Sequence, residues 1–71
     1  MKLTEVQMTL LKGLEFLHLE EDNIKMVMLM LKSEEQQMGM LLWLADNIKK
    51  GISQEKVMDK AQEIMISLEK Q

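Results

Sequence analysis

The sequence predicts an all-α protein, a small four-helix bundle, and three observations support this. The 71-residue chain contains no proline, the residue that most strongly disrupts a helix interior. Its most frequent residues are Leu, Met, Lys, Glu and Gln, which all favour helices. Helix start and stop signals divide the chain into four segments, at about residues 4–19, 21–32, 34–50 and 54–70.

The first helix begins at Thr4, because Thr4 and Gln7 have the spacing of a capping box. The acidic run EEDN that follows this helix is typical of the first turn of another, with Glu21 or Asp22 as its cap. One continuous helix over residues 4–31 is the alternative, because five apolar residues lie seven apart. These residues are Leu3, Leu10, Leu17, Ile24 and Leu31.

The third and fourth helices have their own start and stop signals. Ser33 and Gln36 form a second capping box, so the second helix ends just before Ser33 and the third begins there. Two lysines followed by Gly51 indicate the end of the third helix, since cations favour a helix C-terminus and glycine adopts the left-handed conformation. Ile52 would close this turn with an apolar contact, and Ser53 would cap the fourth helix.

Each helix carries apolar residues at the i, i+3, i+4, i+7 spacing of a face that packs into a core. No linker or internal repeat interrupts the chain, so residues 1–71 are expected to form one domain. The expected core residues, helix by helix, are Leu3, Val6, Leu10, Leu14 and Leu17; Ile24, Val27, Met28 and Leu31; Met38, Leu41, Leu42, Ala45 and Ile48; and Val57, Ala61, Ile64 and Leu68.

The second and third helices are apolar on nearly all sides, which is more than one core face requires. Because Met adapts its shape to partners and Trp often anchors interfaces, we expect the surplus residues to form a partner-binding surface. These residues are Met26, Leu29, Met30, Met40 and Trp43, and the expected rim is Lys25, Lys32, Gln36 and Asn47. The alternative is that the second helix lies centrally and buries both of its faces within the bundle.

Gly13 and Gly39 lie inside expected helices, where each costs about 1 kcal/mol relative to alanine. Gly39 comes one turn before Trp43, so it could leave room for the indole or for a partner's side chain. The alternative for both glycines is a tolerated imperfection in the helix.

Residues 44–57, LADNIKKGISQEKV, resemble the helix-turn-helix of phage-repressor-type regulators. In that family a Leu-Ala pair precedes a Gly-Ile-Ser-Gln turn, and a following Val packs the second helix. Five residues separate Ala45 from Gly51, where the family usually places three, which would rotate the two helices out of the familiar angle. The resemblance implies a DNA-binding regulator that uses residues 44–60, with contacts from Gln54, Lys56 and Lys60.

The charge composition argues against nucleic acid as the main partner. The chain has nine lysines, no arginine and a net charge of −3, whereas arginine supplies the bidentate contacts to guanine and phosphate. Acidic residues alternate with lysines in the would-be recognition helix, and carboxylates repel phosphates. Protein binding is therefore the predicted function, and DNA binding is the alternative.

Residues suited to catalysis are scarce. The chain has no cysteine, and Ser33 and Ser53 are expected in helix caps. One histidine with two carboxylates, here Glu15, His18 and Asp22, makes a poor metal site. We therefore expect no enzymatic activity, no cofactor and no bound metal.

A chain of this size leaves much of its surface in water, and without cysteine it cannot form disulfides. Oligomerisation is the remaining source of stability, so we expect a homodimer that completes the bundle. An early acidic residue at the N-terminus and the lack of an apolar run of about 20 residues favour a cytoplasmic protein without a membrane partner. Small acidic helical proteins of this kind suit adaptor, inhibitor or antidote roles in bacteria or phages.

Overall fold

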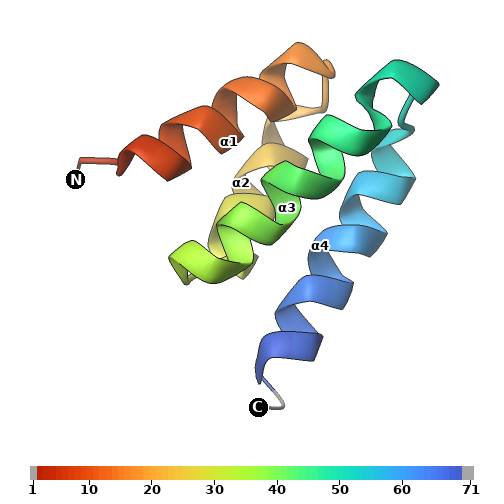
Figure 1. Ribbon diagram of the computed structural model, residues 1–71. Helices are drawn as coiled ribbons and strands as arrows, with labels where there is room; N and C mark the ends of the chain where they lie inside the picture. Colours follow the sequence, from red (N-terminus) through yellow and green to blue (C-terminus); the bar gives the residue numbers. More distant parts are fainter. Residues whose placement is uncertain (1, 70–71) are drawn as a thin grey trace.

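The computed structural model describes residues 2–69, which form a bundle of four α-helices (Figure 1). The helices are α1 (Glu5–Phe16), α2 (Glu21–Met30), α3 (Glu34–Asn47) and α4 (Gln54–Glu69), with a 3-10 turn, η1 (Ile48–Lys50), directly after α3. The described residues contain no strand, so the predicted all-α four-helix fold is confirmed. The expected helix end at residue 70 and the side chain of Leu68 lie outside the described part.

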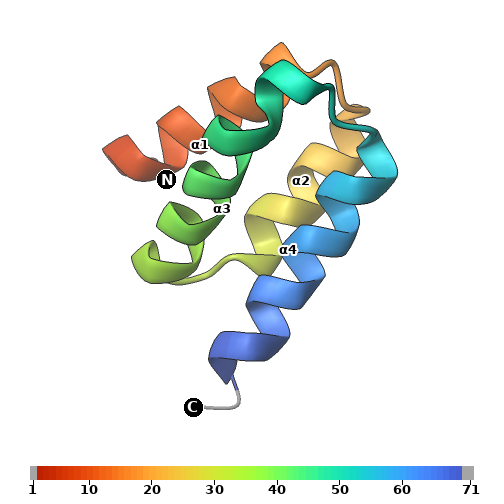
Figure 2. The same ribbon diagram turned by 45° about the vertical axis from the view of Figure 1, so that its right-hand side comes forward.

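The helices form a ring in which each one packs against two others. Both α1 and α4 pack against α2 and α3, whereas over residues 2–69 no close approach joins α1 to α4 or α2 to α3. In Figure 1, α3 lies at the front between α1 and α4, with α2 behind it. Figure 2 shows α1 beside α3 and α2 beside α4. Although α2 and α3 are consecutive in sequence, they therefore lie at opposite corners of the bundle.

The chain turns sharply between α1 and α2. His18 has a φ of +60°, a left-handed conformation that is uncommon outside glycine but enriched in His, Asn and Asp. The alternative of one helix over residues 4–31 is therefore wrong. The predicted caps of α2 are also wrong, since the N-cap is Glu20 and its side chain makes no capping bond. Instead, the Glu20 backbone N–H donates to Gln54 Oε1 of α4 at 2.7 Å.

Three predicted helix starts are confirmed by hydrogen bonds. The Gln7 N–H donates to Thr4 Oγ1 at 3.1 Å, and the Thr4 N–H donates to Gln7 Oε1 at 2.8 Å. Ser33 and Gln36 make the same reciprocal pair, with both distances 3.1 Å. Ser53 Oγ accepts a backbone N–H from the first turn of α4 at 3.2 Å. All three caps follow from local sequence, because each partner lies three residues away.

The end of α3 follows the prediction in part. Gly51 has a φ of +82°, a conformation that residues with a Cβ rarely adopt. Ile52 is half-buried and packs against the core, which is the expected apolar contact after the turn. The α-helix itself ends at Asn47, and the expected last turn is the tighter η1.

The core lies between the four helices and includes most of the predicted stripes of α1, α2 and α4. Leu3 and Val6 are exceptions, since Leu3 is exposed and Val6 is half-buried outside the core cluster. Leu19 is a core residue from the α1–α2 connection that the sequence pattern did not indicate. The buried apolar residues are Leu10, Leu14, Leu19, Ile24, Val27, Leu31, Met40, Leu44, Val57 and Ala61. The spacing pattern therefore identified the inward face of three helices.

The predicted core face of α3 is wrong at three of its five positions, whereas Leu41 packs against the core as predicted and Ile48 is half-buried. Met40 and Leu44 are buried, whereas Leu42 is 64% exposed and Met38 is 43% exposed. Ala45 is exposed as well. At about 100° per residue, the true core face is rotated by about a third of a turn from the predicted stripe. The physical reason is that α3 has apolar residues on both sides, so its pattern does not define one inward face.

Two buried glutamines complete the inner side of α3. Gln36 closes the capping box, and its Oε1 also accepts the Lys32 N–H at 2.9 Å. Gln37 donates from Nε2 to the Leu31 carbonyl at the end of α2, at 2.8 Å. Buried polar groups need such partners, and no buried side-chain nitrogen or oxygen in the described residues lacks one. These bonds explain why two glutamines lie on the inner side of α3, where the spacing of apolar residues predicts no polar side chain.

Candidate functional site

The five residues of the predicted partner-binding surface do not form one patch. Met26 and Leu29 are 49% and 74% exposed on α2. Met30 and Trp43 are half-buried and pack against the core. Met40 is fully buried, so its assignment to a surface is wrong. Since α2 and α3 lie at opposite corners of the bundle, their outer sides cannot combine into the single surface that was expected.

The expected rim is also only partly at the surface. Lys25 and Lys32 are exposed, and Lys25 Nζ lies 3.9 Å from a carboxylate oxygen of Glu21. Gln36 is buried in the capping box, so its place in the rim is wrong. Asn47 is half-buried, and its Nδ2 donates to a backbone carbonyl one turn earlier in α3 at 2.8 Å.

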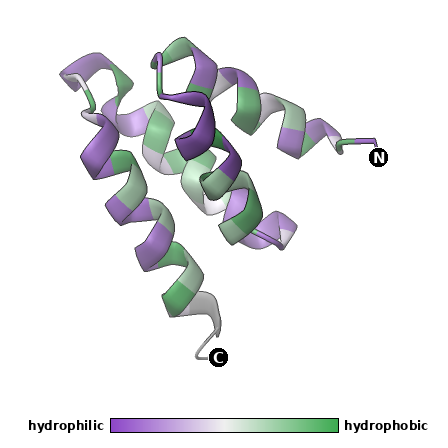
Figure 3. Cartoon of the chain, turned by 180° about the vertical axis from the view of Figure 1, so that it is seen from behind, coloured by the Kyte–Doolittle hydropathy of each residue, from purple (hydrophilic) through white to green (hydrophobic). Residues whose placement is uncertain are grey.

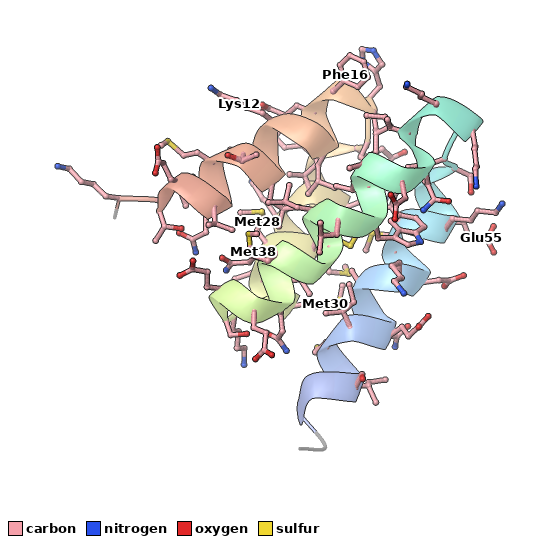
Figure 4. The ribbon with its side chains drawn as sticks, in the orientation of Figure 1. Lys12, Phe16, Met28, Met30, Met38 and Glu55 are labelled. Carbon is pink, nitrogen blue, oxygen red and sulfur yellow. The ribbon has the colours of Figure 1, made fainter. Side chains whose placement is uncertain are left out.

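The outward side of α3 carries an exposed stripe instead. We define the outer stripe as five residues spaced 3, 4, 3 and 4 apart: Glu35, Met38, Leu42 and Ala45 on one side of α3, and Lys49 in η1, the 3-10 turn that directly follows α3. All five are exposed. In Figure 1, α3 lies at the front of the bundle, with its packing partners α1 and α4 on either side of it. Figure 4 marks Met38 beside α3, in the same view.

Sequence reasoning found Met38, Leu42 and Ala45 but assigned them to the core. The charged residues at both ends of the same stripe could have indicated that it faces outward. Glu35 precedes the apolar residues and Lys49 follows them at matching spacing. Charged residues are rarely buried without a partner, so this stripe was the better candidate for the outward side.

Neither helical glycine is required by a close approach of helices. A Cβ added to Gly39 would lie 3.9 Å from Ile64 Cδ1, and one added to Gly13 would lie 3.7 Å from Leu44 Cδ1. Both distances are ordinary van der Waals contacts. Gly39 does line an open groove of about 290 Å³ between α3 and α4, so the idea that it leaves room for a side chain stays a prediction.

The residues of the DNA-binding alternative are mostly engaged within the chain. Gln54 accepts the Glu20 N–H, which joins the start of α4 to the start of α2. Lys60 Nζ lies 3.3 Å from Glu63 Oε1. Lys56 is exposed. A DNA contact by Lys60 would compete with its bond to Glu63, and the Oε1 of Gln54 is already used within the chain, so the structure gives this alternative no added support.

A hollow of about 600 Å³ lies at the junction of α1 and α2. Glu15 and His18 line it, but Asp22, the third residue of the metal set considered above, does not. Among residues 2–69, no three His, Asp or Glu side chains are placed to hold a metal ion. In the same part of the chain, every helix is too short or too polar to cross a bilayer.

Compared with protein-family models, with curated proteins and with solved structures, the chain matches none. Evidence for function therefore comes from the surface chemistry of the bundle itself.

Proposed function

We propose that the protein is a small non-enzymatic protein-binding module of the adaptor, inhibitor or antidote type, and that the outer stripe of α3 is its docking surface. The observation that carries this proposal is the exposure of Leu42, with Met38 and Ala45 exposed one turn to either side. A line of apolar side chains along a helix is the common anchor for a partner helix or groove. Covering such residues contributes about 25 cal/mol for each Å² of apolar area removed from water.

The α2 residues Met26 and Leu29 are a smaller candidate surface. They occupy a single turn, whereas the apolar part of the outer stripe extends over two turns. Lys25 is exposed on the same helix and Lys32 just beyond its end, and both keep strongly hydrated charges near this turn. The outer stripe offers the longer apolar contact and is therefore the favoured docking site.

Photo-crosslinking tests this proposal. A photoreactive side chain at position 42 is expected to form covalent adducts with protein, either a second copy or another protein, when the variant is irradiated in a cell extract. Positions 29 and 62 are the matched controls, since Leu29 is an exposed apolar residue of α2 and Gln62 an exposed polar residue of α4. Stronger adducts from position 42 than from position 62 support the proposal.

Two other outcomes contradict it in different ways. Adducts from position 29 but not from position 42 would move the docking surface to α2. The same weak background from all three positions would argue against a protein-binding surface on either helix.

A further inference from the structure

We infer that the partner of the outer stripe is a second copy of this chain, whose α3 lies antiparallel to the first with the two Leu42 side chains at the centre. This inference rests on the proposed function and identifies the protein that binds the outer stripe. It begins from the order of residues along the stripe, which is acidic at one end, apolar in the middle and basic at the other. Such an order is complementary to itself when one copy is reversed.

The charges select the antiparallel arrangement. Glu35 and Lys49 each lie seven residues from Leu42, on opposite sides of it, and both are exposed. In an antiparallel pair, Glu35 of each copy comes opposite Lys49 of the partner subunit, and two-fold symmetry makes this contact twice. A parallel pair would instead set like charges beside each other at both ends, which is unfavourable.

The sizes of the apolar residues fit the same register. Met38 of one copy lies against Ala45 of the partner subunit, so a long flexible side chain fills the space above a small one. Asp46, exposed beside the stripe, also comes opposite Met38 of the partner subunit, so no two carboxylates face each other. Apolar contacts at the centre supply the affinity, while the charge pairs at the rim mainly set the orientation.

The α2 surface lacks this self-complementarity. Lys25 already lies beside Glu21 of its own helix, at 3.9 Å, and the exposed apolar residues are limited to Met26 and Leu29. The outer stripe is short for an interface, so we expect a dimer that dissociates at about micromolar concentrations rather than an obligate one.

Light scattering or sedimentation equilibrium over about a hundredfold range of concentration tests the inference. The mass of the wild-type chain should rise from one copy to two. Leu42→Lys should raise the dimer Kd by about a hundredfold or more, since it places two cations at the centre of the interface. Leu29→Lys makes the same change at an even more exposed residue of α2 and should leave Kd within about threefold. Circular dichroism confirms that both variants remain folded.

A charge exchange tests the register. Glu35→Lys or Lys49→Glu alone should raise Kd by about tenfold, because each places two pairs of like charges in the dimer. The double variant should restore the wild-type Kd. Glu55→Lys is the matched control, since Glu55 is the second residue of α4 as Glu35 is of α3, and it is exposed away from α3 (Figure 4). It should leave Kd unchanged.

Each contrary result has a definite meaning. A chain that stays monomeric at every concentration overturns the inference, and adducts to a different protein from position 42 would then leave the proposed function standing. A dimer that dissociates with Leu29→Lys but not with Leu42→Lys places the interface on α2. A dimer that is sensitive to Leu42→Lys but is not restored by the double charge exchange contradicts the antiparallel register.

Discussion

The helices α3 and α4 differ in how clearly their sequences define an inward face. Hydrophilic residues recur on every turn of α4 (Figure 3), and its buried residues Val57 and Ala61 are those that the spacing predicted. Between Glu35 and Asp46, α3 carries no charged residue, and three of its five predicted core residues are exposed. The comparison shows that polar positions decide the orientation of a helix as much as apolar ones do, because charged side chains are costly to bury.

The inner face of α3 was selected by its contacts with the other elements. Gln37 must turn inward to donate to the Leu31 carbonyl, and Met40 and Leu44 follow it on the same side. Leu44 also lies beside Gly13 of α1, since a Cβ added at Gly13 would meet Leu44 Cδ1 at 3.7 Å. No pattern within α3 contains this information, since both partners belong to other segments.

The largest expected effect distinguishes the two sides of α3. Met40→Ala should lower the free energy of unfolding by about 2–5 kcal/mol, because it leaves a cavity in the core, and such a loss unfolds much of a domain of this size. Leu42→Ala should change it by less than about 0.5 kcal/mol, since that side chain is exposed. Urea unfolding followed by circular dichroism measures both, at a concentration where the chain is monomeric. Equal losses would mean that α3 has no preferred inward face.

A smaller effect is expected where the inner side of α3 is polar. Gln37→Ala should cost about 1–3 kcal/mol, because the buried Leu31 carbonyl loses its amide donor. Gln62→Ala, at an exposed position of α4, is the control and should stay within about 0.5 kcal/mol of the wild type. The same urea unfolding experiment compares them. If the two losses were alike, the bond from Gln37 would not contribute to the orientation of α3.

The smallest expected effects concern the glycines of α3 and of the turn before α4. Gly39→Ala should stabilise the protein by about 0.5–1 kcal/mol, since the added Cβ meets only an ordinary contact with Ile64 and alanine favours the helix. Gly51→Ala should destabilise it by about 1–2 kcal/mol, because Gly51 has a positive φ. Thermal melting of both variants measures the opposite signs. A loss of stability in Gly39→Ala would show that the α3–α4 contact is tighter than these distances indicate.

Local sequence by itself determined the all-α class, the four segments, the caps at Thr4, Ser33 and Ser53, and the inward faces of α1, α2 and α4. Each of these depends on residues within a few positions of one another, where spacing and hydrogen bonding act directly. Only the tertiary structure decided which side of α3 faces inward and that α2 and α3 lie at opposite corners. For that reason the residues of the predicted binding surface lie on separate sides of the bundle. Met38, Leu42 and Ala45, which were expected in the core, instead belong to the outer stripe. The physical reason is that an apolar helix face is stable against any apolar partner, so the final choice depends on contacts between distant segments.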